Sequence, residues 1–230
     1  MEEIIYNSYE KDVAVYGDFE MPVPTYELEK QIDFSVILAL LLVSNSNRKE
    51  DTYRYIDYSR INKREICEEC KISRYTLERR LKYLEEKNII TLKNTKRGLT
   101  CIINYSKNGR YYVSIQHRIL KALNSTFNKN IVKTYILLNI QCEYLKNTRP
   151  MTNAFLCSQL GYATNNERNL TNMGQWTSTL ANCGFIEKIQ NRVYVKNEDG
   201  KNIVERVDTY YKINPLEVWE KRKEKGVINV

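Results

Sequence analysis

Apolar and polar residues alternate along this chain in a pattern that predicts helices followed by hairpins. Residues 33–44 are apolar almost throughout, which predicts a buried helix with Asp33 as its N-cap. A polar, tyrosine-rich stretch at 45–61 separates that helix from a short second one at 63–70, for which Asn62 is the expected cap. The pattern thus begins with one buried helix and one short helix.

Residues 71–97, KISRYTLERRLKYLEEKNIITLKNTKR, show the most informative pattern. Leucines recur there at intervals of three and four residues, at Leu77, Leu81 and Leu84. This periodicity predicts a helix that buries one face and leaves its polar and basic side chains mostly on the others. Asn88 is expected to stop the helix, a β-branched strand follows, and Gly98 marks a hairpin turn with basic residues beside it. Residues 111–115 are expected to form the returning strand.

The same order of elements recurs in the second half of the chain. Helices are predicted there at 130–145, 152–160 and 170–183. The segment NCGFIEKI aligns with EKNIITLK when Ile186 is matched to Ile90, a shift of 96 residues. A longer hairpin follows, with a turn at Asn197, Asp199 and Gly200, and DTYYKINPLEVWEK then matches GRYYVSIQHRILKA. The chain is therefore expected to hold two copies of one unit.

The predicted fold class is α+β, mainly α, with two tandem winged helix-turn-helix domains related by an internal repeat. A chain of 230 residues suits two domains of about 100 residues, each able to bury a core. The predicted parts are an acidic N-terminal segment at 1–30, domain 1 at 31–115, a linking helix at 116–127 and domain 2 at 128–230.

The positive charge of the chain is concentrated in one segment. The net charge is +8, from 36 Lys and Arg against 28 Asp and Glu, yet residues 1–30 hold only 2 basic against 8 acidic side chains. Residues 71–97 hold 9 basic against 3 acidic ones. A lysine-rich surface that only kept the protein soluble would disperse its charge, whereas a cluster beside a helix-turn-helix pattern is typical of binding a polyanion.

The predicted third helix and hairpin of domain 1 match the end of a winged helix-turn-helix domain, in which the helix enters the major groove and the hairpin follows phosphate. The candidate DNA contacts are Ser73, Arg74, Tyr75, Thr76, Arg79 and Arg80 in and beside the groove, with Lys82, Lys93, Lys96 and Arg97 on the phosphate backbone. For Tyr75, packing between the helix and the hairpin is an equally open alternative.

Domain 2 carries amide and hydroxyl groups where domain 1 carries guanidinium groups. Asn and Gln can pair with adenine edges, and Thr can contact bases or phosphate. The candidate contacts in this domain are Asn169, Thr171, Asn172, Gln175, Arg192 and Lys196. The alternative is that domain 2 mediates packing or dimerisation, with Trp176 in the interface.

The sequence lacks the motifs of common catalytic and metal sites. The single histidine, His117, has no nucleophile motif around it, and no GxxxxGK[ST], GxGxxG or HExxH motif is present. Cys67 and Cys70 have metal-like spacing but no second pair, so a metal or redox role would need Cys101 to fold back beside them. We therefore expect no enzyme activity, no cofactor and no metal, and core packing for most of the six cysteines.

The N-terminal residues, MEEIIYNSYEKD, are acidic and lack the apolar core of a signal peptide. The longest apolar run, at 36–43, is far shorter than the roughly 20 residues that span a membrane. We expect a cytoplasmic protein with reduced cysteines and no membrane partner.

The sequence DFEMPVPTYELEKQIDFSVILALLLVSNSN, followed by NKREICEECKISRYTLERRLKYLEEKNII, resembles the N-terminal winged-helix region of replication initiators and replisome organisers of Gram-positive plasmids and phages. The shared pattern, over 20–105, is a VP element, a long apolar helix, a polar excursion and an IS-[RK]-x-T-[LV] recognition helix. The resemblance implies a sequence-specific double-stranded-DNA-binding protein that acts at origin repeats, with a second winged-helix unit as in plasmid initiators.

Two alternatives stay open at this point. The segment SRYTLERRLKYLEE also fits many winged-helix transcriptional regulators, and a winged-helix fold can serve as a protein-interaction module. Double-stranded DNA is the expected partner. A homodimer, and contacts with the replication or transcription machinery, are compatible with either DNA-binding role.

Overall fold

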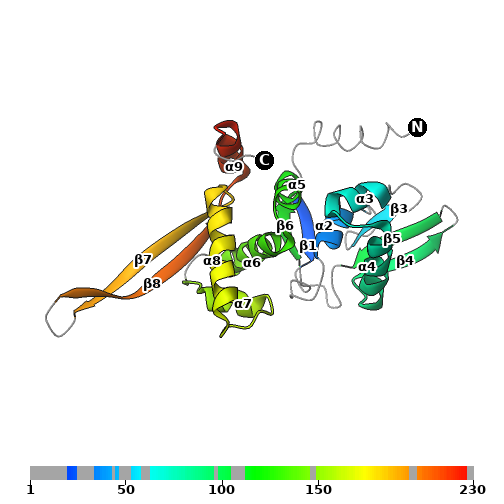
Figure 1. Ribbon diagram of the computed structural model, residues 1–230. Coiled ribbons are helices and arrows are strands. Elements are labelled where there is room, and N and C mark those ends of the chain that lie inside the picture. Colours follow the sequence, from blue (N-terminus) through cyan, green and yellow to red (C-terminus); the bar gives the residue numbers. More distant parts are fainter. Residues whose placement is uncertain are drawn as a thin grey trace. The chain divides into compact units, whose positions relative to one another are not determined.

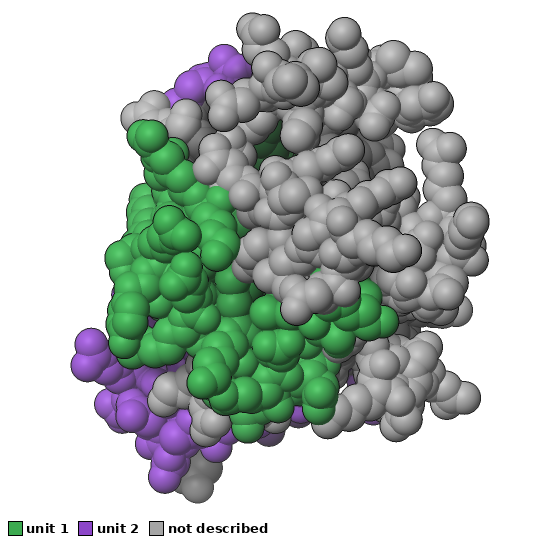
Figure 2. All heavy atoms as spheres, turned by 90° about the vertical axis from the view of Figure 1, so that its right-hand side faces the viewer, with its two compact units in different colours: residues 1–27, 33–126 green, residues 28–32, 127–230 purple. Residues whose placement is uncertain are grey.

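The computed structural model describes residues 20–24, 34–42, 45–46, 53–57, 63–95, 98–104, 112–145, 149–196 and 201–226. Within these residues the chain is α+β and mainly helical, with three small antiparallel sheets (Figure 1). It divides into two compact units, unit 1 with the described residues up to Thr126 and unit 2 with those from Phe127 onward (Figure 2). Each unit is described by itself below.

Unit 1 is built around one fully apolar helix. Its elements are β1 (Glu20–Pro24), α2 (Phe34–Leu42), β2 (Asn45–Ser46), β3 (Tyr53–Asp57), α3 (Lys63–Cys70), α4 (Arg74–Glu86), β4 (Ile90–Thr95), β5 (Gly98–Asn104), β6 (Tyr112–Gln116) and α5 (His117–Thr126). Helix α2 packs against α3, α4 and α5, and every residue of it except Ser35 is buried. A helix that is apolar all round is stable only when it is enclosed in this way.

The sheet of unit 1 differs from the prediction, which placed no strand in the polar stretch 45–61, where β2 and β3 lie. β5 is the strand that returns from β4, with Thr95 opposite Gly98, and β3 pairs with the other edge of β5 in the order β2-β3-β5-β4. The prediction that 111–115 returns from the hairpin is therefore wrong. β6 pairs instead with β1, with Val23 opposite Val113, because both side chains are buried on the core face of that ribbon.

Two further sequence-based boundaries are placed differently in the structure. β1 lies within the segment 1–30, which was expected to precede the domain, and the predicted linking helix is α5, which belongs to unit 1 and packs against α2. The expected caps Asp33 and Asn62 lie outside the described residues, as does the turn at Asn197, Asp199 and Gly200.

Unit 2 repeats the order of helices and hairpin. Its elements are α6 (Lys129–Leu145), α7 (Asn153–Gln159), α8 (Glu167–Asn182), β7 (Ile186–Lys196), β8 (Asn202–Ile213) and α9 (Leu216–Glu224). Phe185, between α8 and β7, has the rings of Phe127, Tyr135 and Trp219 at centroid distances of 5.6, 6.0 and 5.5 Å. These aromatic contacts fix the start of the hairpin against α6 and α9.

The two units share backbone hydrogen bonds at corresponding positions. Asn88 and Gly184, 96 residues apart, both have positive φ, at 57° and 85°, immediately after α4 and α8. In each unit the next amide reaches back to the helix: Ile89 donates to the Leu84 carbonyl at 2.9 Å and Phe185 donates to the Leu180 carbonyl at 3.0 Å. Both helices thus end in a Schellman motif, which leads the chain into the following strand.

Arg222 of α9 holds the C-terminal end of α8 in unit 2. Its guanidinium Nη1 donates to the carbonyl oxygens of Ala181 and Asn182 at 2.6 and 2.7 Å. These are among the last carbonyls of the helix, where a cation is favoured by both hydrogen bonding and the helix dipole. A Cβ at Gly184 would lie 2.8 Å from Arg222 Cδ, so glycine also leaves room for this side chain.

Replacing Arg222 with alanine is expected to lower the free energy of unfolding of unit 2 by about 1–2 kcal/mol, because two charge-assisted hydrogen bonds at a helix end are lost. The two tryptophans of the chain, Trp176 and Trp219, both lie in unit 2, so urea unfolding followed by tryptophan fluorescence reports on this unit. Lys221→Ala, at the exposed neighbouring position, is the control. Equal unfolding midpoints for the two variants would show that the cap adds no stability.

Candidate nucleic-acid interface

Helix α4 is fixed at its start by a side-chain cap and along its length by leucines. Ser73 is the N-cap: its Oγ accepts a hydrogen bond from the Thr76 amide at 3.2 Å and lies 2.9 Å from the Thr76 hydroxyl. The predicted leucines, Leu77, Leu81 and Leu84, are all buried. Ser73 and Thr76, both candidate DNA contacts, therefore have a local role in starting the helix.

The face of α4 opposite the leucines carries Tyr75, Arg79 and Lys82, which we call the outward stripe. Residues spaced by four and three along a helix share a face, and all three side chains are exposed. Tyr75 is 76 % exposed, so the alternative that it packs between the helix and the hairpin is wrong. Within the described part of the chain, neither Arg79 nor Lys82 makes a hydrogen bond or ion pair, and their donors face solvent.

One flank of the outward stripe holds a small charge network. The Nε of Arg74 donates to Glu78 Oε1 at 3.2 Å, and Lys63 Nζ approaches the same oxygen at 3.4 Å. The hydrogen bonds from Arg74 and from Lys63 lower the pKa of the Glu78 carboxyl, which stays ionised at neutral pH. Arg74 thus has an internal counter-ion, so it adds less net positive field than Arg79 does.

The other flank of the stripe is basic and aromatic. Arg80 is half-buried, and Lys87 Nζ lies 5.7 Å from the ring centroid of Tyr83, a cation–π distance. Lys87 was counted in the charged cluster but was not among the candidate contacts. Its position seven residues after Arg80, on the same exposed flank of α4, is the sequence signal that could have identified it as a candidate.

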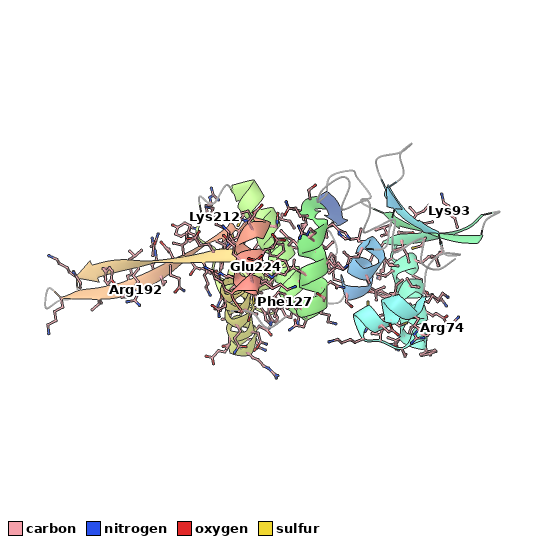
Figure 3. All side chains as sticks on the ribbon, turned by 90° about the horizontal axis from the view of Figure 1, so that it is seen from above. Arg74, Lys93, Phe127, Arg192, Lys212 and Glu224 are labelled. Carbon is pink, nitrogen blue, oxygen red and sulfur yellow. The ribbon has the colours of Figure 1, made fainter. Side chains whose placement is uncertain are left out.

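A side chain of α4 accepts a hydrogen bond from the β4–β5 hairpin. The Leu92 amide donates to Glu85 Oε1 at 3.2 Å. Lys93 follows on β4, exposed and opposite Thr100 (Figure 3). The candidate contacts Lys96 and Arg97 follow β4 directly and lie outside the described residues. Unit 1 therefore presents a cationic face on α4 and an exposed lysine on β4, and a hydrogen bond joins these two elements.

Helix α8 has a corresponding outward face with fewer cations. A shift of 96 residues places Thr171, Gln175 and Ser178 at the positions of the outward stripe, and Met173, Thr177 and Leu180 at those of the buried leucines. Thr171 and Gln175 are exposed, whereas Ser178 accepts a hydrogen bond from Lys188 Nζ at 3.2 Å. None of the three residues is a cation, but the exposed Arg168 in the first turn of α8 lies three residues before Thr171 and adds a guanidinium to the same face.

The other candidate DNA contacts of unit 2 differ in how exposed they are and in whether they already make a hydrogen bond within the unit. The Asn169 amide nitrogen donates to the Ala163 carbonyl at 3.0 Å, which anchors the loop before α8, and Asn172 is half-buried. Trp176 is half-buried with its ring 5.6 Å from that of Tyr162. Arg192 and Lys196 are exposed on β7, and Figure 3 shows Arg192 on the part of the hairpin that extends beyond the helices of unit 2.

The cysteines and the histidine are placed in or beside the core. The Cys101 thiol is buried in β5, where burial and then the charge of Glu85 raise its pKa to about 12. Cys70 donates weakly to the Ser35 carbonyl at 3.5 Å. No three His, Cys, Asp or Glu side chains of the described residues gather as a metal site requires, so Cys101 does not join Cys67 and Cys70. His117, at the start of α5, is buried.

Among the residues that the structure describes, none of the helices combines the length and apolar composition that crossing a membrane requires. Comparison of the chain with protein-family models, with curated proteins and with solved structures finds no match.

Proposed function

We propose that this protein is a sequence-specific double-stranded-DNA-binding protein of two winged-helix units, in which α4 enters the major groove and the β4–β5 hairpin lies along the phosphate backbone. The observation that carries the proposal is the outward stripe, where Arg79 and Lys82 stand opposite a leucine-packed face with no internal counter-ion within the described residues. Cations held on a rigid helix face and left unpaired are suited to an external anion.

The dimensions and chemistry of α4 fit a duplex better than they fit a protein groove. An α-helix with side chains is about 10–12 Å across, and the major groove is about 12 Å wide. The stripe carries a guanidinium, which can pair with two acceptors of one guanine, and a lysine that suits phosphate. A helix that docks into a protein groove is expected to present an apolar stripe, and the exposed face of α4 has none.

Within this proposal the candidate residues take different roles. Arg79 reads a base edge, and Arg74, oriented by Glu78, lies beside the groove against flanking phosphate. Lys82, Lys93, Lys96 and Arg97 hold phosphate, and unit 2 adds hydroxyl and amide contacts from Thr171 and Gln175. The resemblance to replication initiators makes the repeats of a replication origin the DNA target that we propose.

Arg79→Ala is expected to reduce the preference for the bound site over random duplex by about 1–3 kcal/mol, because a bidentate contact to one base is lost. Lys93→Ala is expected to weaken binding to both duplexes about equally, because phosphate carries no sequence information. The site is first selected from a library of random duplexes with the unaltered chain, and each variant is then titrated with selected and random DNA.

The two substitutions are matched controls for each other, since each removes one exposed cation of unit 1. If Arg79→Ala weakens selected and random duplex alike, α4 holds DNA without reading it. If library selection enriches no sequence at all, the sequence-specific part of the proposal fails.

A further inference from the structure

The β7–β8 hairpin holds most of the exposed apolar surface in the described part of the chain. Of eight large apolar or aromatic side chains that are exposed there, six lie on this hairpin, and each is between 37 % and 54 % exposed. They are Ile189, Tyr194, Val195, Ile203, Val204 and Val207. Soluble proteins rarely expose such a concentration of apolar side chains without a partner.

The register of the hairpin places apolar side chains on both of its faces. Tyr194 lies opposite Val204, and the next pair, Val195 with Ile203, points to the other face. A ribbon with one face in water alternates apolar and polar residues, and the outer part of this hairpin does not. Neither face is therefore suited to permanent exposure to solvent.

Only the inner part of the hairpin is anchored to unit 2. Ile186 and Tyr211 are buried there, and Lys188 Nζ donates to Thr177 Oγ1 at 3.1 Å. Beyond the register shift between Val193 and Tyr194, the hairpin extends away from the helices of unit 2 (Figure 1). We call residues 192–196 and 202–207 the outer arm.

Both edges of the outer arm also offer unpaired backbone groups. Among the strands that the structure describes, β7 and β8 pair only with each other, so each leaves one edge of its hydrogen-bonding ladder open. A two-stranded ribbon without a packed face is only marginally stable in water. A partner that covers the faces or extends the sheet would stabilise the outer arm.

The charge of the hairpin favours a protein partner over nucleic acid. Residues 192–207, which include the outer arm, hold 4 basic and 3 acidic side chains, against 9 and 3 in 71–97. The hairpin therefore has almost no net field to attract a polyanion. A surface with both signs and apolar residues on each face is instead complementary to itself, as a two-fold contact requires.

We propose that the outer arm is the surface through which two copies of this chain associate, arm against arm about a two-fold axis. The contact brings the apolar faces of the two arms together and places an exposed cation of one copy, Arg192, near Glu205 of the other. Arg192 and Lys196 then lie at the contact between copies. The proposal does not depend on DNA binding.

The size of the outer arm sets the strength expected of this contact. A standard interface uses about 20–30 residues from each partner, whereas the outer arm contributes 11 described residues per copy. The dimer is therefore weak, with a dissociation constant on the order of 1–100 µM, and exists at equilibrium with the monomer.

Sedimentation velocity of the full chain without DNA, from about 1 to about 300 µM protein, spans this range of dissociation constants. The unaltered chain should shift from monomer toward dimer as its concentration rises. Val195→Lys with Ile203→Lys should weaken association at least tenfold, and Tyr194→Lys with Val204→Lys tests the other face. Ser114→Lys with Ser125→Lys, which adds two lysines at exposed positions of unit 1, should associate like the unaltered chain.

Two results would overturn the proposal. One is an unaltered chain that stays monomeric throughout the range, and the other is a dimer that both arm variants leave unchanged. Far-ultraviolet circular dichroism verifies that each variant is folded. If one of the two double variants of the outer arm does not fold, the other still tests the proposal. If the chain is monomeric and the arm variants instead lose affinity for duplex DNA, the arm contacts nucleic acid and the dimer proposal is wrong.

Discussion

Binding of this protein to mixed-sequence duplex DNA is expected to weaken about a thousandfold when monovalent salt rises from about 50 to about 200 mM. Each phosphate that a cation neutralises releases condensed counterions, and about six such contacts give a loss of this size. Unit 1 can supply them from the exposed Arg79, Lys82 and Lys93 together with basic residues of its flanks and hairpin. Fluorescence anisotropy of a labelled duplex at several salt concentrations measures how steeply the binding constant falls with salt, which we call the salt slope.

The salt slope of the duplex binding constant distinguishes DNA binding from the alternative of a protein-interaction module. A surface whose charge only keeps the protein soluble would bind duplex weakly at every salt concentration, with no steep dependence. A flat response, or no binding at the lowest salt, would contradict the proposed function.

Reversing the charge of the outward stripe, with Arg79→Glu and Lys82→Glu together, is expected to lower duplex affinity at least about a hundredfold. Two attractive contacts are lost and two carboxylates are placed where phosphate or base acceptors should lie. Both side chains are exposed and lie opposite the leucine face, so the fold of unit 1 should be unchanged. Circular dichroism and the thermal unfolding midpoint verify this.

The matched control for this variant is Lys121→Glu with Lys221→Glu, which changes the net charge equally at exposed positions on α5 and α9. It should reduce affinity only severalfold, through the lower net charge of the chain. If the control loses as much affinity as the stripe variant, DNA binding depends on overall charge and α4 has no special role.

Local patterns in the sequence were sufficient to predict the helices of unit 1. α3 spans the predicted residues 63–70. α4 begins after Ser73 and ends before Asn88, because a capping residue, a leucine periodicity and a stop residue follow one another closely in the sequence. The outward stripe follows from the same periodicity. The pair of Arg74 with Glu78, four residues apart, could also have been predicted from spacing alone.

Contacts between distant segments could not be predicted in this way. The alternating burial of Val113 and Ile115 is typical of a strand, but the partner of that strand, β1, lies about 90 residues earlier in the chain. Lys63, the second partner of Glu78, comes from a different helix. The exposure of the outer arm was also missed, because its apolar residues alone are equally compatible with a buried strand.

The measurement that tests the central claim most directly is lysine footprinting of the unaltered full chain, with and without saturating duplex DNA at low salt. An amine-reactive reagent and mass spectrometry report the reactivity of each lysine separately. Lys82 and Lys93 are exposed on α4 and β4, and Lys121 is exposed on α5. The proposal predicts that duplex DNA protects Lys82 and Lys93 and leaves Lys121 as reactive as before. Equal reactivity of Lys82 and Lys93 with and without bound DNA would contradict it.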